Sequence, residues 1–486
     1  VREEQKVTEH SRAWHRAMRR RRRSKITLIA FTFLLLLICL ILLKYTEKMT
    51  SSKAIGNTTT RSITARIPDA VKNALQGANS AKHPDLLRKF PYPFKAMLAI
   101  SSDADMTTLE EFEEYHRFLN TKEQTPYGVG LGLDIGDSTW LYIANDTSEK
   151  VDKDGHSVEY SMSYFQGVDP KKLKDSKKIV HYFKIGWIDS LHTFGDFSRN
   201  DHSIKFTRGL AVAAWNAMNQ SGFKPEIWIN HGTETNAQNF GVYNSHTLFK
   251  YQQGDNPKSP YYHTDLTLKN GIRYVWNSIG GNQFSYDDPL FPIHLRDGQN
   301  VWGFYRYTNE LNKGKIDWTW ETQFISRQIT KTRLDQLVHE GKYSVVTQHL
   351  GKGSNGFPFT KEGIQTLHLL KTYNDEGKIL VARTTRLLDY ARSDKYVHYS
   401  VVQLDGKTYI NINSIDDPVL GSSVPSIDDI RGLTFYVNDP SNTCLLLNLN
   451  PISGDEIQYN SQDGNGKKSV EIKWYTPDYT DYTKAA

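Results

Sequence analysis

The amino-acid sequence predicts an α/β fold built around a parallel sheet or a distorted (β/α) barrel, with a β-rich region after it and one membrane-spanning helix before it. Helical patterns that end at a glycine and lead into an apolar strand recur between residues 89 and 392. After residue 393 short apolar runs alternate with Gly, Asn, Asp and Pro. An apolar run of 18 residues, Ile26–Leu43, follows an arginine cluster. The 486 residues are enough for two or three domains.

The first 88 residues are predicted to form a basic cytoplasmic tail (1–25), a transmembrane helix (26–44) and a stalk (45–88). Five consecutive arginines, Arg19–Arg23, stand before the apolar run, and the residues after it carry far less positive charge. The positive-inside rule therefore places the N-terminus in the cytoplasm and the rest of the chain in the periplasm or outside the cell. A cleaved signal peptide is the alternative, but its apolar core is usually shorter and a small-residue cleavage site should follow.

The distribution of charge argues against a nucleic-acid partner. The net charge is +6, but residues 1–25 hold eight Arg and two Lys against three Glu, which is +7 and leaves −1 for the remaining residues. The main body therefore has no basic excess with which to bind phosphates. Cys39 lies inside the apolar run and Cys444 is the only other cysteine, so no disulfide is expected in the exported part.

The region from residue 89 to residue 392 is predicted to contain repeated units of helix and strand. A strand at residues 97–100 leads into a helix that begins at Thr108-Leu109-Glu110-Glu111, a capping-box pattern. Three further units pair a helix with a strand: residues 210–218 with 226–229, 334–338 with 343–349, and 364–370 with 379–382. In folds with parallel strands the chemistry collects at the carboxyl ends of the strands. The side chains at such predicted ends are Asp103, Asp105, His231 and His349.

Residues 393–486 are predicted to form a separate, sandwich-like antiparallel β domain. The turn-forming residues between its apolar runs are typical of short strands joined by tight connections. The predicted strands cover residues 397–402, 407–412, 433–437, 443–449 and 469–474.

Two short clusters predict a metal site. Asp103 and Asp105 are two residues apart at a strand end, where alternate side chains share a face. His192 and Asp196 are four residues apart, so one helical turn would place them on the same side. Carboxylates with imidazoles suit a divalent metal, expected to be zinc, and so a hydrolase that activates water. Singly these residues have plainer explanations, because a strand-end aspartate often caps a helix and His349 could be a core histidine.

The order of these residues resembles that of the NodB-type polysaccharide deacetylases, a family of carbohydrate esterases. The family's acid pair at the end of the first strand corresponds to Ser101–Asp105. Its His-Ser/Thr-x-x-His motif corresponds to His192–Asp196, and its last apolar strand ending in His corresponds to Val345–His349. The resemblance covers about residues 90–392. Three more segments resemble a divergent bacterial branch of the family: Trp228–Gly232, Tyr262–Leu266 and Gly271–Trp276.

The resemblance implies a deacetylase-type barrel and a set of roles for these residues. It assigns the metal to Asp105, His192 and Asp196, the general base to Asp103 and the general acid to His349. The base would take a proton from water that attacks the acetamide carbonyl, and the acid would protonate the leaving amine. The products would be acetate and a free amine on the sugar.

Two departures from the family pattern affect this assignment. Ala104 separates two aspartates that are adjacent in the family, and Asp196 stands where the family has a second metal-binding histidine. A carboxylate can replace imidazole on zinc. Alternatively the ligand role passes to His231, which is therefore kept as a reserve ligand.

Other residues are weaker candidates for contact with the metal or the substrate. His263 and Asp265 are reserve substrate contacts, and His294 is a reserve residue of the cleft. Arg383 follows the last predicted strand and is a candidate for orienting Asp103. Trp276 and Trp302 are candidates for stacking on sugar rings, although core packing is the usual role of tryptophan.

The sequence thus predicts a membrane-anchored, metal-dependent hydrolase that removes acetyl groups from an N-acetylated cell-surface or exported polysaccharide. Two alternatives remain open. One is a glycoside hydrolase on a β/α barrel, which needs two carboxyl groups at a defined separation. The other is a glycan-binding barrel that has lost its metal.

Overall fold

The computed structural model describes residues 67–78, 85–105, 107–143, 161–197, 206–231, 236–242, 251–278, 281–351 and 359–484. The predicted tail (1–25) and apolar run (26–44) lie outside these residues. Within the described ranges no helix is both long enough and apolar enough to cross a bilayer. The predicted membrane anchor, and the periplasmic or extracellular location deduced from it, are therefore not retained.

Nine strands form the central sheet. All neighbouring strands in it run parallel except β13 and β14, which pair antiparallel at one edge. β2 pairs with β17 along its whole length and with β18 and β5 at its two ends. In pairing order the strands are β13 (Leu290–His294), β14 (Asn300–Phe304), β12 (Tyr274–Trp276), β11 (Ile227–Ile229), β9 (Ile188–Leu191), β5 (Asp137–Thr139), β2 (Ala96–Ser102) and β17 (Tyr343–Gln348), with β18 (Ile379–Val381) beside β2.

The central sheet does not close, so the predicted (β/α) barrel is wrong. Among the residues described, isolated bridges join Tyr286 to Tyr343 and Tyr307 to Val346, but no ladder joins the two edge strands. Helix α10 (Thr384–Tyr396) and the C-terminal strands pack on the sheet face that a barrel would turn inward. The inside of an eight-stranded barrel has room for side chains only, so this packing is incompatible with closure.

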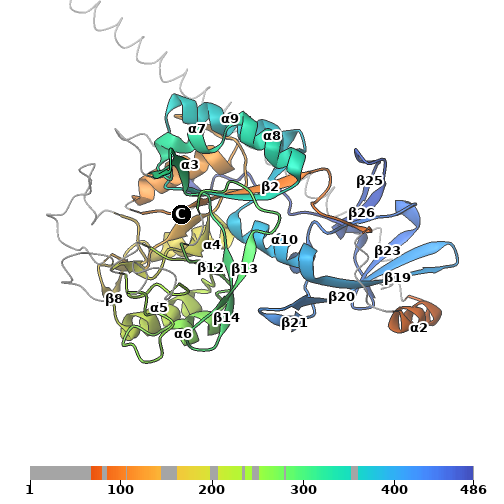
Figure 1. The fold of residues 1–486 in the computed structure, drawn as a ribbon, viewed down its shortest axis with the longest axis horizontal. Coiled ribbons are helices and arrows are strands. Elements are labelled where there is room, and N and C mark those ends of the chain that lie inside the picture. Colours follow the sequence, from red (N-terminus) through yellow and green to blue (C-terminus); the bar gives the residue numbers. More distant parts are fainter. Residues whose placement is uncertain are drawn as a thin grey trace, which may run out of the picture. The chain divides into compact units, whose positions relative to one another are not determined.

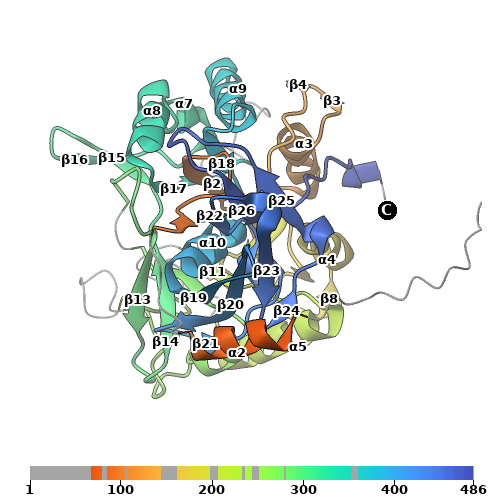
Figure 2. The ribbon, with the colours of Figure 1, turned by 90° about the vertical axis from the view of Figure 1, so that its right-hand side faces the viewer.

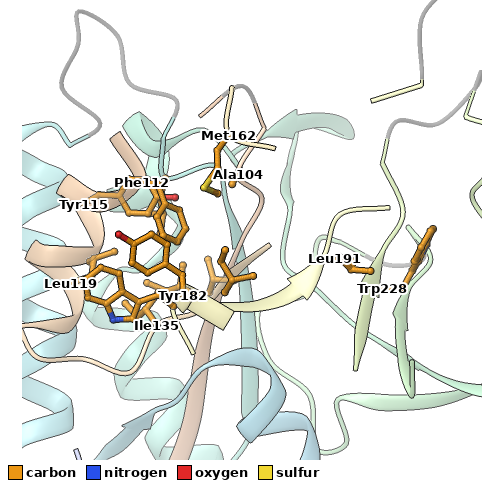
Figure 3. Packing of buried hydrophobic residues seen from close by; sticks show 14 of the residues in the cluster. Ala104, Phe112, Tyr115, Leu119, Ile135, Met162, Tyr182, Leu191 and Trp228 are labelled. Carbon is orange, nitrogen blue, oxygen red and sulfur yellow. The ribbon is translucent and has the colours of Figure 1, made fainter. Parts of the chain in front are cut away.

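Helices cover the opposite face of the central sheet. Leu98 and Ile100 of β2 are buried there among apolar side chains of α3, α4, α5, α8 and α9. Figure 3 shows Phe112 of α3 beside Tyr182 of α4, with ring centroids 5.2 Å apart. Strand residues therefore alternate between the two covered faces, as expected for a sheet buried on both sides. The helices of this region are α3 (Leu109–Asn120), α4 (Ser176–Ile185), α5 (Arg208–Ser221), α6 (Thr264–Lys269), α7 (Ile325–Gln328), α8 (Lys331–Glu340) and α9 (Lys361–Asp375).

Two smaller sheets consist mainly of strands that come after α10, and Figure 1 shows α10 between them and the central sheet. The predicted antiparallel arrangement is wrong at one pair, because β20 and β23 run parallel. Met97 and Ala99 of β2 share an apolar cluster with Tyr399 and Val470, so the core continues across the predicted boundary at residue 392. One sheet contains β19 (Val397–Leu404), β20 (Lys407–Asp417), β21 (Gly421–Ser423), β23 (Thr443–Leu447) and β24 (Asn450–Pro451); the other contains β1 (Leu87–Arg88), β22 (Thr434–Tyr436), β25 (Ile457–Asn460) and β26 (Ser469–Ile472).

Shorter elements complete the fold. Helix α2 (Asp69–Gly77), within the predicted stalk, packs Val71 and Leu75 against Tyr409 of β20 and Leu446 of β23. Figure 2 shows α2 at the lower end of the sheet that contains β20 and β23. Four two-stranded pairs stand outside the larger sheets: β3 (Gln124–Thr125) with β4 (Gly128–Val129), β7 (Phe165–Gln166) with β8 (Asp169–Leu173), β15 (Asn309–Asn312) with β16 (Lys315–Trp318), and β6 (Tyr142–Ile143) with β10 (Gly195–Asp196).

Most of the individual elements predicted in the sequence are confirmed. The Thr108 hydroxyl accepts from the Glu111 amide, and the Glu111 carboxylate accepts from the Thr108 amide, which is the predicted capping box. Helices α5 and α8 end at Gly222 and Gly341, whose φ angles of 75° and 61° lie in the left-handed region.

Candidate metal centre

Five polar side chains meet beyond the carboxyl ends of the central strands. Side chains alternate along a strand, so every second residue lies on the same face of the sheet. Each of the five side chains is in step with the strand residues that face α10. Met97 and Ala99 lead to the two aspartates, and Ile227 and Ile229 lead to a histidine. The five side chains are Asp103, Asp105, His231, Arg306 and His349; His192, after β9, joins them.

Asp105 is at the centre of this group and faces three imidazoles. Its Oδ1 is 3.1 Å from Nε2 of His192, and its Oδ2 is 3.3 Å from Nε2 of His231. The Nε2 atom of His349 is 3.4 Å from the same Oδ2. Asp105, His192 and His349 are buried, and His231 is partly exposed. The three nitrogens therefore surround one buried carboxylate.

The donor set fits a divalent metal. Ligand atoms of Asp105, His192 and His231 all lie within 4.8 Å of one another. Tetrahedral zinc with ligands at 2.0–2.2 Å separates neighbouring ligand atoms by about 3.4 Å. The two carboxylate oxygens of Asp105 are at similar distances from the histidines, Oδ1 at 3.1 Å from His192 and Oδ2 at 3.3 Å from His231. One carboxylate with two imidazoles is a donor set used by catalytic zinc sites, which keep the fourth position open. These three residues are therefore the candidate ligands.

The electrostatics of Asp105 favour this role. Burial raises the pKa of the Asp105 carboxyl, but the charges and hydrogen bonds of His192 and His231 outweigh burial and hold the pKa well below its ordinary value. The carboxylate therefore stays ionised at neutral pH, as a metal ligand must be.

Asp103 is held by a different partner. Its Oδ2 accepts a hydrogen bond of 2.8 Å from Nη2 of Arg306, which also donates to the Ser101 carbonyl at 2.9 Å. The guanidinium is fully buried, and its Cζ lies 4.6 Å from the centroid of the Trp276 ring. Asp103 Oδ1 is 3.8 Å from Nδ1 of His192. Asp103 is therefore a buried carboxylate beside the candidate ligands, oriented by an arginine.

Neighbouring strands fix the backbone that carries the two aspartates. The amide of Asp103 donates to the carbonyl of Gln348 in β17, and the amide of Ala104 donates to the hydroxyl of Ser138 in β5. Ser102 accepts from the amide of Leu350. Because β2 lies between β5 and β17, this loop is held from both sides.

The segment after β9 does not form the predicted helical turn. Thr193 has a φ of 60°, and Gly195–Asp196 form β10, which pairs with β6. The hydroxyl of Thr193 bonds to the carbonyls of His192 and Gly195, which gives a tight turn and not a helix. His192 reaches Asp105 from this turn. The side chain of Asp196 lies outside what the structure describes, so its predicted ligand role stays a prediction.

Asparagines hold the backbone of the second histidine. The amide of His231 donates to Oδ1 of Asn239, and the side chains of Asn236 and Asn239 both donate to the His231 carbonyl. Asn236 is therefore buried support for this histidine.

Tryptophans border the site. The Trp140 ring is stacked against His192 and lies edge-on to His231, with centroid distances of 6.1 and 5.2 Å. The Trp320 ring is 4.3 Å from the imidazole of His349, and the Trp320 carbonyl accepts from the His349 amide. These rings limit the freedom of the imidazoles and shield them from water.

Two reserve residues, His263 and Asp265, have structural partners. The ring of His263 bonds to Thr267 Oγ1 and to the Gln238 carbonyl, and burial lowers its pKa to about 4. Asp265 forms an ion pair with Arg208. These two residues are not part of the group around Asp105.

The other two reserve residues also lie outside that group. His294 is at the edge of the sheet, where its Nδ1 bonds to Asn300. Arg383 pairs with Asp134, not with Asp103. Trp302, predicted as a stacking residue, donates from its indole nitrogen to Asp417 in the core.

Sequence reasoning missed Arg306, which orients Asp103, the role predicted for Arg383. A signal was present, because Arg306 follows the end of β14 by two residues, as Asp105 follows β2 by three. The strand itself, Asn300-Val301-Trp302-Gly303-Phe304, is interrupted by Asn and Gly and was not recognised.

Comparisons with known proteins do not identify the chain. No model of a known protein family matches it, and no significant match to a curated protein is found. The assignment of function therefore depends on the geometry of the site.

Proposed function

We propose that the chain is a metal-dependent hydrolase that removes acetyl groups from an N-acetylated polysaccharide. The observation that carries the proposal is the convergence of Asp105, His192 and His231 around one point beside a non-ligand carboxylate, Asp103. These residues come from strands that are far apart in the sequence, so no local pattern forces them together. The resemblance to polysaccharide deacetylases supplies the substrate class.

The residues present can carry out amide hydrolysis. A divalent metal held by Asp105, His192 and His231 would act as a Lewis acid toward the substrate carbonyl and lower the pKa of water. Asp103, held by Arg306, accepts the proton that the attacking water loses as its oxygen bonds to the acetamide carbon.

His349 completes the reaction. It protonates the nitrogen as the carbon–nitrogen bond breaks, which releases acetate and a free amine. Its Nε2 is 3.4 Å from Asp105 Oδ2, so its ring lies at the same site as the candidate ligands. The ring contact with Trp320 keeps the imidazole in place.

The geometry gives less support to a glycoside hydrolase. Both mechanisms of that class need two carboxyl groups that act on the substrate, one of them as a proton donor. Here Asp105 is surrounded by imidazoles that lower its pKa, and Asp103 is paired with a buried arginine. The environment of Asp105 therefore does not favour the protonated carboxyl that this class needs.

The test combines elemental analysis with acetate release from chitopentaose by the purified full chain. We expect stoichiometric metal in the wild type, and loss of metal and activity in Asp105→Ala and His192→Ala. Asp103→Asn should keep the metal and lose about a hundredfold or more of the rate. Asp265→Asn, at a surface ion pair, is the matched control and should keep both. Unchanged acetate release in both Asp105→Ala and His192→Ala would refute the site.

One further pair of variants separates the two candidates for the third ligand. We expect His231→Ala to lose the metal and Asp196→Ala to retain it, because His231 Nε2 faces Asp105. The opposite result would return the ligand role to Asp196, as the family pattern implies.

A further inference from the structure

The hairpin β15–β16 is a preformed platform next to the candidate centre. Its register pairs Leu311 with Ile316 and Asn309 with Trp318. The two turn residues, Lys313 and Gly314, have φ angles of 50° and 78°, which is the type I′ turn that suits a two-residue hairpin loop. The hairpin therefore needs no ligand to adopt its shape.

One face of the hairpin is used to anchor it. Glu310 accepts from Arg327 at 2.7 Å and from Arg333 at 2.9 Å, and Asp317 accepts from Arg327 at 2.5 Å. These arginines belong to α7 and α8, so ion pairs fix the hairpin against two helices. Figure 2 shows the hairpin extending beyond α8 at the left of the view.

The other face is apolar and exposed. Because side chains alternate along each strand, Leu311, Ile316 and Trp318 share this face. Their relative exposures are 58%, 57% and 54%. These three large apolar side chains therefore lie together on one exposed face and are not scattered singly over the surface.

This face is continuous with the candidate active site. Arg306 is three residues before β15, and Thr319, directly after β16, donates to the Thr308 carbonyl and extends the ladder toward the site. Trp320, whose ring contacts His349, is two residues after Trp318, so the Cα atoms of the two tryptophans are at most about 7 Å apart. The exposed face is thus two residues along the chain from the residue that packs on the proposed general acid.

We propose that Leu311, Ile316 and Trp318 form a subsite for sugar residues beyond the one that is deacetylated, so that the substrate is an oligomer or polymer. This inference rests on the proposed function, since it places the reacting sugar beside His349. Sugar rings present apolar C–H faces that stack on aromatic rings.

A second copy of the chain is the main competing occupant. A stable protein interface buries about 800 Å² per partner, and three side chains on a narrow hairpin supply far less. Self-association also does not require the apolar face to be near His349. A glycan bound at the candidate active site, in contrast, would extend onto this face.

The experiment compares Trp318→Ala with Tyr459→Ala, which removes an equally exposed aromatic (56%) from β25 in a C-terminal sheet. Binding of chitopentaose and chitobiose is measured by calorimetry, which does not depend on turnover, and acetate release is measured in parallel. For Trp318→Ala we expect the Kd and KM for chitopentaose to rise about tenfold, with kcat and the values for chitobiose unchanged. Tyr459→Ala should match the wild type in every measurement.

The two proposals fail in different ways. Equal binding of chitopentaose by Trp318→Ala and wild type, or no binding by the wild type, overturns the subsite. Weaker binding by Trp318→Ala without acetate release by any variant supports the subsite and contradicts the deacetylase. A concentration-dependent dimer of the wild type that Trp318→Ala abolishes, seen by sedimentation, assigns the face to a second copy and also overturns the subsite.

Discussion

At the scale of single residues, Arg306 fixes the position of the Asp103 carboxylate, although Arg306 itself is not a candidate metal ligand. Its guanidinium is fully buried, and within the described part of the chain its only ion pair is with Asp103. Its contacts with the Ser101 carbonyl and the Trp276 ring fix it in one orientation. Arg306 is therefore a positioning residue, since it acts on the substrate only through the carboxylate it holds.

Arg306→Lys should lower kcat at least about tenfold while the KM and the metal content stay near wild type. Lysine keeps the charge but lacks the planar guanidinium, which lies over the Trp276 ring while its Nη2 bonds Asp103 and the Ser101 carbonyl, so the Asp103 carboxylate loses its fixed position. The measurements are steady-state acetate release and elemental analysis. Arg383→Lys, at the Asp134 pair, controls for the loss of a partly buried, ion-paired arginine elsewhere and should leave kcat unchanged. Equal effects in the two variants would assign Arg306 a purely structural role.

The residues of the site differ in how far the sequence reveals them. Asp103, Asp105 and His349 follow apolar strands, so strand periodicity alone places them at one edge of a sheet. His231 was recognised as a strand-end residue, but its proximity to Asp105 depends on the pairing of β9 with β11, which no local pattern encodes. Arg306 was missed because its strand is interrupted by polar and small residues.

At the scale of elements, the tight turn between β9 and β10 decides where His192 points. The spacing of His192 and Asp196 suggested a helix, yet the turn has a left-handed Thr193 and a glycine pressed against β6. A Cβ atom at Gly195 would lie 2.3 Å from the Tyr142 carbonyl oxygen, well inside van der Waals contact. Only the contact with a distant strand excludes the helix, so the local spacing could not reveal the turn.

Gly195→Ala should lower the free energy of unfolding by about 1–3 kcal/mol, because the added methyl group forces β10 away from β6. It should also weaken metal retention, since His192 lies on the displaced turn. Urea denaturation and metal content after dialysis against a chelator measure the two effects. Gly209→Ala is the control, because its nearest neighbour would be 3.6 Å away and alanine favours the helix by about 0.5–1 kcal/mol. Equal stability of Gly195→Ala and wild type would show that the turn adjusts freely.

At the scale of the whole molecule, the predicted helix and strand units are present, but the central sheet does not close into the predicted barrel. The helix–glycine–strand units were found because each is a local pattern of apolar periodicity ended by a turn residue. Closure depends instead on what covers the second face of the sheet, and here α10 and strands from beyond residue 396 cover it. These contacts join parts of the chain separated by hundreds of residues, so single-sequence periodicity does not contain them.

The four-stranded sheet gives a direct test of this long-range packing. It joins β1, near residue 87, to β26, and the buried Glu471 of β26 lies at the junction. The Glu471 carboxylate accepts from the amide of Tyr92 and from the side chain of Asn460. Burial raises its pKa to about 8. The folded chain thus holds a proton here at pH values where the unfolded chain, with an ordinary glutamate, has lost it.

Between about pH 4.5 and pH 8 the folded state binds more protons at Glu471 than the unfolded state, so this group makes the free energy of unfolding fall as pH rises, by roughly 1 kcal/mol per pH unit. Glu471→Gln keeps a carbonyl acceptor and removes the titration. We therefore expect its stability relative to wild type to increase steadily from pH 5 to pH 8 in urea denaturation. Glu362→Gln, at an exposed position in α9, controls for the loss of one charge and should give a flat difference. If the difference in unfolding free energy between Glu471→Gln and wild type also stays constant with pH, water reaches this junction. The C-terminal strands then do not pack against β1 as the shared core requires.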